Sequence, residues 1–249
     1  MTPTMEPKVS DLKIKLFADG ADFDGILKMA ANPLIKGFTT NPTLMRKAGI
    51  SDYAAFARRV LDAIRDRPVS FEVFADDFQT MERQAHEIAS WGQNVNVKIP
   101  VTKTDGVSAT GMIGKLSNAG ISLNVTAVMT LDQVKAIRDV LHPGTPAIVS
   151  IFAGRIADTG RDPVPVMSAA LQLLKTLPKA ELIWASPREL LNVFQADLIG
   201  CHIITATNDI LAKLPLVGKD LAAYSLETVA MFRKDALAAG FDIAVKPEG

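Results

Sequence analysis

Residues 94–101 read NVNVKIPV, and polar and apolar side chains alternate along them with a period of two. This alternation predicts a β-strand with Val95, Val97 and Ile99 on one face and Asn96 and Lys98 on the other. A parallel strand covered by helices turns its apolar face toward those helices. The run therefore predicts a strand whose lysine points to the opposite, inner side.

Runs of similar length occur eight times, and stretches with helical periodicity separate them. The expected strands are 13–19, 37–41, 69–75, 94–101, 121–128, 147–153, 181–186 and 201–207. The expected helices are 23–31, 53–65, 80–91, 108–119, 131–141, 164–174 and 188–196, then 210–213 and 226–239. Strict alternation predicts parallel strands with right-handed crossovers. Eight units favour an α/β fold that is a single-domain (β/α)8 TIM barrel with extra C-terminal helices, and a doubly wound open sheet is the alternative.

The composition is that of a folded protein with no strong charge bias. The 249 residues are 48% hydrophobic, and 27 basic residues balance 27 acidic ones, which excludes a disordered chain. Zero net charge gives no global attraction to nucleic acid or to an anionic membrane, so we expect neither as a partner. Because no linker interrupts the pattern, we expect one domain over 1–249, with 1–12 as an N-terminal extension and 219–249 as a C-terminal helix and tail.

Targeting and cofactor signals are weak throughout the sequence. No apolar run approaches the length of a membrane span, and the first residues lack the apolar core of a secretory signal, so we expect a soluble cytoplasmic protein. The single cysteine, Cys201, rules out an internal disulfide and a multi-thiolate metal site. The three histidines do not have metal-ligand spacing and no nucleotide-binding glycine loop is present, so we expect no metal and no cofactor.

Polar residues gather at the ends of the expected strands, where barrels place their chemistry. An inward Lys98 must be paired or neutral, and a neutral amine attacks carbonyl groups to form Schiff bases. The alternative is an edge-strand lysine in solvent. Asp19 alone suggests a loop cap, and Glu72 suggests either a buried partner or an exposed carboxylate. Together, an inward amine and two carboxylates supply a nucleophile and two proton-transfer groups.

Two arginines, Arg155 and Arg188, follow the expected sixth and seventh strands. The loops after late barrel strands often bind phosphate, and the planar guanidinium group matches phosphate oxygens. The alternative for either arginine is a surface ion pair.

The motifs at these strand ends resemble those of a known family. They are FADGAD (17–22), TTNPTL (39–44), VKIPVT (97–102), NVT (124–126), SIFAGR (150–155) and ASPR (185–188). In this order they resemble the transaldolases and the related fructose-6-phosphate aldolases, class I Schiff-base enzymes on a (β/α)8 barrel. The chain length resembles the short branch of the family, whose members commonly assemble, so we expect a homo-oligomer, a pentamer or decamer. The resemblance also implies carbohydrate metabolism, in the pentose phosphate pathway.

The resemblance implies a role for each matching residue. Lys98 would form the Schiff base with the donor ketone, and Asp19 would take the proton of the hydroxyl beside the breaking bond. Glu72 would transfer protons through a water that Thr126 also holds. The dihydroxyacetone portion would be bound by Asn41, Asn124 and Ser150, and the phosphate by Arg155, Ser186 and Arg188.

Two positions favour the transaldolases over the aldolases within this resemblance. The aldolases usually carry Gln where this chain has Glu72, and Tyr where it has Phe152. The expected reaction is transfer of a dihydroxyacetone unit from a ketose phosphate, of the fructose 6-phosphate or sedoheptulose 7-phosphate type, to an aldose phosphate. Pro187 replaces a common aromatic residue, so a sulfonated or otherwise modified ketose is an alternative substrate. A fructose-6-phosphate-type aldolase is a second interpretation of these motifs, and an inactive sugar-phosphate-binding barrel is a third.

Overall fold

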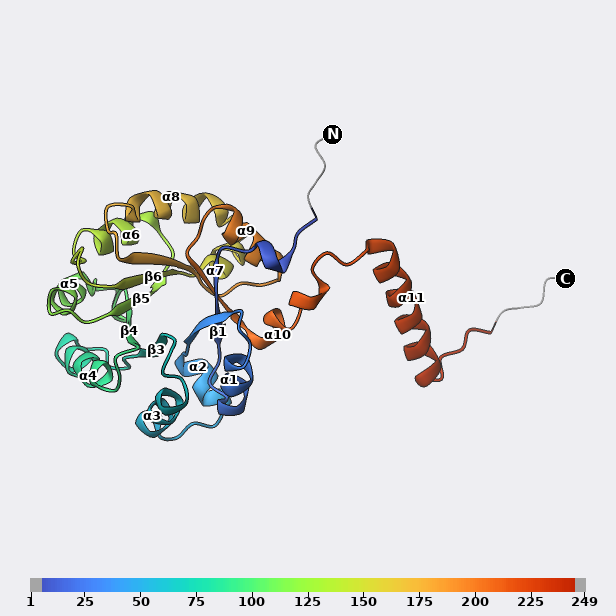
Figure 1. Cartoon of the computed structure of the whole chain (residues 1–249), viewed down its shortest axis with the longest axis horizontal. Helices are drawn as coiled ribbons and strands as arrows, with labels where there is room; N and C mark the ends of the chain where they lie inside the picture. Colours follow the sequence, from blue (N-terminus) through green and yellow to red (C-terminus); the bar gives the residue numbers. More distant parts are fainter. Residues whose placement is uncertain (1–5, 245–249) are drawn as a thin grey trace. The chain divides into compact units, whose positions relative to one another are not determined.

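The barrel is formed by eight parallel strands that close in sequence order. Figure 1 shows the helices lying around these strands. The computed structural model describes residues 6–244, and the barrel unit spans Leu12–Leu214. The strands are β1 (Lys15–Asp19), β2 (Ile35–Thr39), β3 (Val69–Glu72), β4 (Val95–Pro100), β5 (Leu123–Val128), β6 (Ala147–Ile151), β7 (Ala180–Trp184) and β8 (Ile203–Thr207). Because β8 pairs with β1, the barrel is closed. The prediction of a (β/α)8 barrel is confirmed, and the open-sheet alternative is wrong.

Helices follow the strands around the outside of the barrel. They are α1 (Phe23–Ala30), α2 (Pro42–Lys47), α3 (Tyr53–Ala63), α4 (Phe78–Ser90), α5 (Thr110–Asn118), α6 (Leu131–Arg138), α7 (Ala153–Ala157), α8 (Val164–Leu174), α9 (Leu191–Leu198) and α10 (Asn208–Leu211). Two of them, α2 and α7, were not expected from the sequence. The Asn41 side chain accepts a hydrogen bond from Leu44 N, so the chain turns into α2 directly after β2. The expected strands 69–75 and 147–153 end earlier, at Glu72 and Ile151.

The barrel interior is layered because side chains alternate along each strand. Phe17, Ile148, Ile183 and Ile203 form a buried apolar cluster. Two residues further along their strands, β1 and β6 carry the polar residues Asp19 and Ser150, and β8 carries Thr205. A period of two places these residues on the same inner face as the apolar cluster, one layer closer to the carboxyl ends of the strands. The fold therefore places a layer of polar side chains next to the apolar core, at the carboxyl ends of the strands.

The terminal segments 6–11 and 215–244 group into a second compact unit. It contains the turn η1 (Val9–Asp11) and the helix α11 (Leu221–Ala238), and the turn η2 (Leu214–Leu216) lies at the junction of the two units. The Asp220 side chain accepts a hydrogen bond from Ala223 N, so α11 begins five residues before the expected start at 226. The prediction for 1–12 and 219–249 also covers 1–5 and 245–249, which lie outside the described residues. Within residues 6–244, no helix is both long and apolar enough to cross a bilayer.

Candidate active site

A cavity of about 700 Å³ opens at the carboxyl ends of the barrel strands. Its lining includes every residue for which the sequence predicted a role in catalysis or substrate binding. These residues are Asp19, Asn41, Glu72, Lys98, Asn124, Thr126, Ser150, Phe152, Arg155, Ser186 and Arg188. They come from strands and loops far apart in the sequence, and the barrel brings all of them to one cavity.

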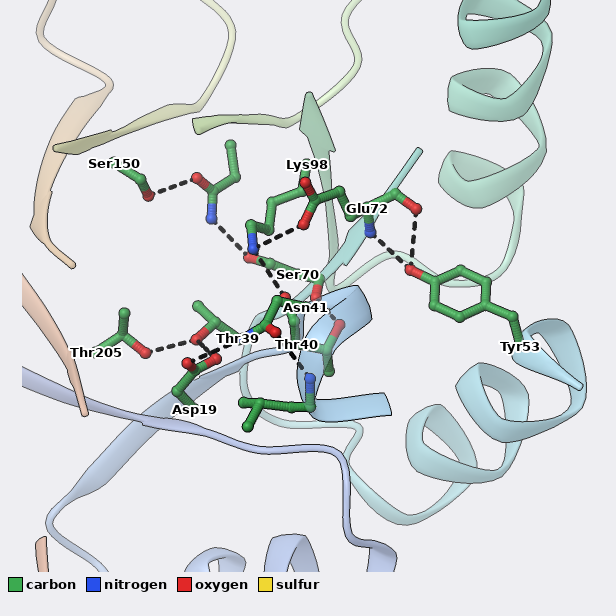
Figure 2. A network of polar contacts seen from close by, with 12 residues as sticks. Asp19, Thr39, Thr40, Asn41, Tyr53, Ser70, Glu72, Lys98, Ser150 and Thr205 are labelled. Atoms are coloured by element: carbon green, nitrogen blue, oxygen red, sulfur yellow. Dashed lines mark hydrogen bonds and ion pairs between the residues drawn. The ribbon is translucent and has the colours of Figure 1, made fainter. Parts of the chain in front are cut away.

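Lys98 lies on β4, and its amine points into this cavity rather than into solvent. The lysine is only 6% exposed, and its Nζ lies 3.0 Å from Glu72 Oε2. The same amine donates a hydrogen bond to Thr40 O at 2.8 Å (Figure 2). The side chain is therefore inward and paired, and the edge-strand alternative is wrong. A carboxylate beside a buried amine can take the proton that the amine must lose to become a nucleophile.

Asp19 forms the opposite wall of the site, at the end of β1. Its Oδ1 accepts from Thr39 Oγ1 at 2.8 Å and its Oδ2 accepts from Asn41 Nδ2 at 3.3 Å. Burial raises the pKa of Asp19 above its ordinary value, although the charge of Lys98 and these two hydrogen bonds oppose that effect. A carboxylate with a raised pKa is a better proton acceptor once it is ionised. Asp19 is therefore a cavity residue suited to general-base chemistry, not a loop cap.

Hydrogen-bonded polar side chains on β3, β5 and β6 extend the polar layer at the base of the site. Ser150 Oγ donates to Asn124 Oδ1 at 2.7 Å, and Asn124 Nδ2 donates to Ser70 Oγ at 3.1 Å. Thr126 Oγ1 is buried and has no hydrogen-bond partner among the described residues. A buried hydroxyl of this kind is suited to bind a polar group that enters the cavity. The next residue, Ala127, has a positive φ of 61°, where the pairing register of β5 and β6 shifts.

The two arginines line the cavity at its rim, Arg155 from helix α7 and Arg188 from the loop after β7. The Arg188 guanidinium group contacts Asp158 through Nε, at 2.8 Å from Oδ1, and through Nη2. Its Nη1 donates to Ser186 Oγ at 3.1 Å. Arg188 thus lines the cavity and also forms the ion pair that the alternative interpretation expected. The Arg155 guanidinium group lies 5.5 Å from the centre of the Phe152 ring.

Helix α7 and the loop after β7, which carry these arginines, approach each other closely through their backbones. A Cβ added at Gly154 would lie 1.6 Å from Ser186 O. Ser186 itself has a φ of 58°, in the left-handed region that disfavours residues other than glycine. The position of the rim therefore depends on the absence of a side chain at 154.

Sequence reasoning missed several residues that shape the site. Thr205 Oγ1 lies 2.6 Å from Thr39 Oγ1, and the period of β8 could have revealed its inward position. Tyr53, the first residue of α3, contacts Glu72, and Asp158, the C-cap residue after α7, contacts Arg188. No local pattern marks these two residues, because their contacts depend on how the helices pack.

Solved structures share the fold of the chain. A phosphonomutase-like protein from Burkholderia cenocepacia aligns with a TM-score of 0.53 and 12% identity, covering 89% of this chain and 94% of that one. A 2,3-dimethylmalate lyase aligns with the same score and identity, covering 96% of this chain and 89% of that one. At this level of identity the likeness extends to the barrel alone.

Sequence comparisons give a more specific result. The profile of the family described as "Transaldolase/Fructose-6-phosphate aldolase" matches residues 16–244. A "Probable transaldolase" from Dehalococcoides mccartyi is 34% identical over 215 residues, 85% of this chain and 96% of that protein. Another from Streptococcus pyogenes is 32% identical over 226 residues, 89% of this chain and 100% of that protein. The chain belongs to the transaldolase/fructose-6-phosphate aldolase family.

Proposed function

We propose that the protein is a transaldolase. It transfers a dihydroxyacetone unit from a ketose phosphate, of the fructose 6-phosphate or sedoheptulose 7-phosphate type, to an aldose phosphate through a Schiff base on Lys98. The observation that carries this proposal is the buried Lys98 amine, 3.0 Å from Glu72 Oε2 in a cavity that Asp19 also lines. The names of the relatives, which are probable transaldolases, support it.

The first stage forms the imine. Glu72 takes a proton from the Lys98 ammonium group, and the neutral amine adds to the C2 carbonyl of the ketose. Glu72 then returns the proton to the carbinolamine hydroxyl, which leaves as water, and a protonated imine remains. Thr126, whose hydroxyl has no partner among the described residues, is placed to bind that hydroxyl or the departing water.

The second stage breaks and remakes a carbon–carbon bond. Asp19 takes the proton of the C4 hydroxyl, the C3–C4 electrons move toward the imine nitrogen, and an aldose phosphate leaves. The three-carbon enamine stays bound to Lys98. An incoming aldehyde accepts the enamine carbon, and Asp19 gives its proton to the new alkoxide. Hydrolysis of the imine releases the new ketose and restores the amine.

Transfer requires that the enamine persists until an acceptor arrives. Phe152 lines the cavity with a ring that carries no acidic proton, so it cannot protonate the enamine carbon. Arg155 and Arg188 at the rim supply positive charge for the phosphate group of the donor and of the acceptor. These features favour transfer over release of free dihydroxyacetone.

The test is reductive trapping with borohydride and fructose 6-phosphate. We expect a stable mass increase on the peptide that contains Lys98, and we expect Lys98→Arg to abolish both trapping and turnover, because a guanidinium group stays protonated. Lys15→Arg is the matched control, since Lys15 pairs with Glu181 at the other end of the barrel. Labelling of another lysine with Lys98 unmodified would show that the assignment is wrong.

Product analysis with and without an acceptor separates the transaldolase from the competing interpretations. From fructose 6-phosphate, a transaldolase forms sedoheptulose 7-phosphate when erythrose 4-phosphate is the acceptor, whereas transfer to glyceraldehyde 3-phosphate only regenerates the donor. Without an acceptor it releases little dihydroxyacetone. Release as fast as transfer would establish the aldolase. Trapping of a sulfonated ketose, but not of fructose 6-phosphate, would establish a modified substrate. Absence of trapping with every ketose would leave a sugar-phosphate-binding barrel.

A further inference from the structure

The pairing of β2 with β3 ends before the carboxyl end of β3, where Glu72 lies. The register joins Phe38 to Val69 and Thr39 to Ser70, and Thr40 N donates to Ser70 O at 3.2 Å. Glu72 follows two residues later, so its backbone N–H and C=O point to the same side as those of Ser70. In a continued parallel ladder the next bond would run from Glu72 N to Thr40 O. Thr40 O instead accepts from the Lys98 amine at 2.8 Å.

The Tyr53 hydroxyl replaces β2 as the hydrogen-bond partner of the Glu72 backbone. It accepts a hydrogen bond from Glu72 N at 2.7 Å and donates one to Glu72 O at 3.1 Å (Figure 2). Both polar backbone groups of Glu72 are thus satisfied by one side chain. Burial raises the pKa of the Tyr53 hydroxyl, so the group keeps the proton that it donates.

Tyr53 is held in this position from two directions. It is the first residue of α3, where the Asp52 side chain caps the helix by accepting from Ala55 N at 2.9 Å. Its ring packs edge-on against Phe71, at 6.1 Å between ring centres, and against Phe74, at 4.4 Å. The hydroxyl therefore approaches Glu72 from outside the barrel, and Tyr53 is not among the residues that line the cavity.

We propose that Tyr53 is a positioning residue for the Lys98–Glu72 pair. Its hydroxyl fixes the backbone of Glu72 at the end of β3. Because it also accepts the hydrogen bond from the Glu72 N–H, Thr40 O remains free to bind the Lys98 amine. The amine is then held between one carbonyl oxygen and the carboxylate that takes its proton. The inference rests on the proposed function, in which these two side chains exchange that proton.

The effect of removing the hydroxyl follows from this arrangement. In Tyr53→Phe the Glu72 N–H loses its acceptor and competes with Lys98 for Thr40 O. We expect the rate of Lys98 trapping at saturating fructose 6-phosphate to fall roughly tenfold, because a buried polar group that loses its hydrogen-bond partner costs a free energy of about that size. The KM for fructose 6-phosphate should stay within about twofold, because Tyr53 does not line the cavity. Tyr224→Phe, the same change at the only other tyrosine of the chain, should leave the trapping rate unchanged.

A double-mutant cycle distinguishes positioning from a general effect on the fold. Glu72→Gln keeps the backbone groups that Tyr53 binds but removes the carboxylate. If Tyr53 acts through that carboxylate, Tyr53→Phe should slow trapping by less than about twofold in the Glu72→Gln background. A full, additive loss in that background would overturn the positioning of the Glu72 carboxylate by Tyr53, because only the competition for Thr40 O is independent of that carboxylate.

A second variant covers the case in which Tyr53→Phe does not fold. Asp52→Ala removes the exposed cap of α3 and keeps the hydroxyl, so it loosens the turn that carries Tyr53. We expect roughly threefold slower trapping at an unchanged KM, and a rate equal to wild type would overturn the proposal.

The outcomes for Tyr53 and for the proposed function are distinguishable. Trapping of wild type on Lys98, with Tyr53→Phe trapped equally fast, would overturn the role of Tyr53 and leave the Schiff-base function standing. Failure of wild type to be trapped on Lys98 would overturn both.

Discussion

Asp19 is the residue whose surroundings bear most directly on pH dependence. Its pKa is raised by burial, while the hydrogen bond from Thr39 stabilises the ionised form. Bond cleavage needs the ionised carboxylate, so kcat should fall as the pH drops through this raised pKa. Thr39→Val removes the stabilising bond, raises the pKa further and should move the acidic limb of the kcat–pH profile to higher pH.

Thr205→Val is the matched control for this prediction. It removes the other contact of the Thr39 hydroxyl, 2.6 Å away, and leaves the bond from Thr39 to Asp19 in place. The acidic limb should therefore move less than in Thr39→Val. Equal profiles for wild type and Thr39→Val would show that Asp19 is not the group that titrates in the cleavage step.

Arg188 allows a separate test of the anion site. Its guanidinium group is held by Asp158 and Ser186, so it is oriented at the rim before substrate arrives. Arg188→Ala should raise the KM for fructose 6-phosphate by roughly tenfold or more, the scale of one charge-assisted hydrogen bond, and lower kcat less. The KM for unphosphorylated fructose serves as the control and should hardly change. An unchanged KM for the phosphorylated sugar would place the anion site elsewhere.

At the scale of elements, the contact between α7 and the loop after β7 is the most sensitive. A methyl group at Gly154 would overlap Ser186 O, so one of the two backbone segments must move. Gly154→Ala should lower the free energy of unfolding by roughly 2 kcal/mol or more, which urea denaturation measures. Turnover should fall as well, because Arg155 and Ser186 are carried by the displaced segments.

Gly111→Ala provides the matched control in helix α5. No atom lies within 4 Å of the position that its Cβ would take, and its φ is not in the left-handed region. The same substitution should therefore raise the free energy of unfolding by about 0.5–1 kcal/mol, because alanine is the better helix former. Equal effects of the two substitutions would show that the close approach at Gly154 does not constrain the rim.

The elements also show how far the sequence could predict the structure. The period of two in β4 was enough to predict that Lys98 faces inward, because its apolar neighbours had to meet the helices. Helices α2 and α7 were missed because they span six and five residues, too short for a helical period to show. The pair Asn41-Pro42, a cap followed by a residue favoured at the first helical position, could have revealed α2.

The contacts of Tyr53 and Asp158 could not have been predicted in the same way. Tyr53 reaches Glu72 across 19 residues of sequence and Asp158 reaches Arg188 across 30. Both contacts depend on the packing of a helix beside a strand end. Alternation along a strand determines which way its own side chains face, but it carries no information about a helix residue that approaches from outside.

For the whole molecule, we expect assembly into a homo-oligomer. Helix α11 carries Leu226, Val229 and Phe232 at helical spacing, and apolar helices at chain ends often pack against a neighbouring copy. The alternative is that α11 covers the barrel of its own chain. Light scattering should give a mass several times that of the 26.7 kDa chain. A single species of monomer mass at micromolar concentration would reject assembly.

The uneven pairing of strands divides the barrel into two arcs. The registers of β2 with β3 and of β7 with β8 join two residue pairs each, whereas every other neighbouring strand pair joins four or five. One arc, β8–β1–β2, carries Asp19, and the other, β3 to β7, carries Lys98 and Glu72. Short ladders open first in thermal fluctuations, so amide exchange at Phe38 should be faster than at Val97. Opening along these two lines would change the separation of the Asp19 carboxylate and the Lys98 amine, so we expect the reactive geometry to depend on the strand pairing of the barrel as well as on the side chains that line the cavity.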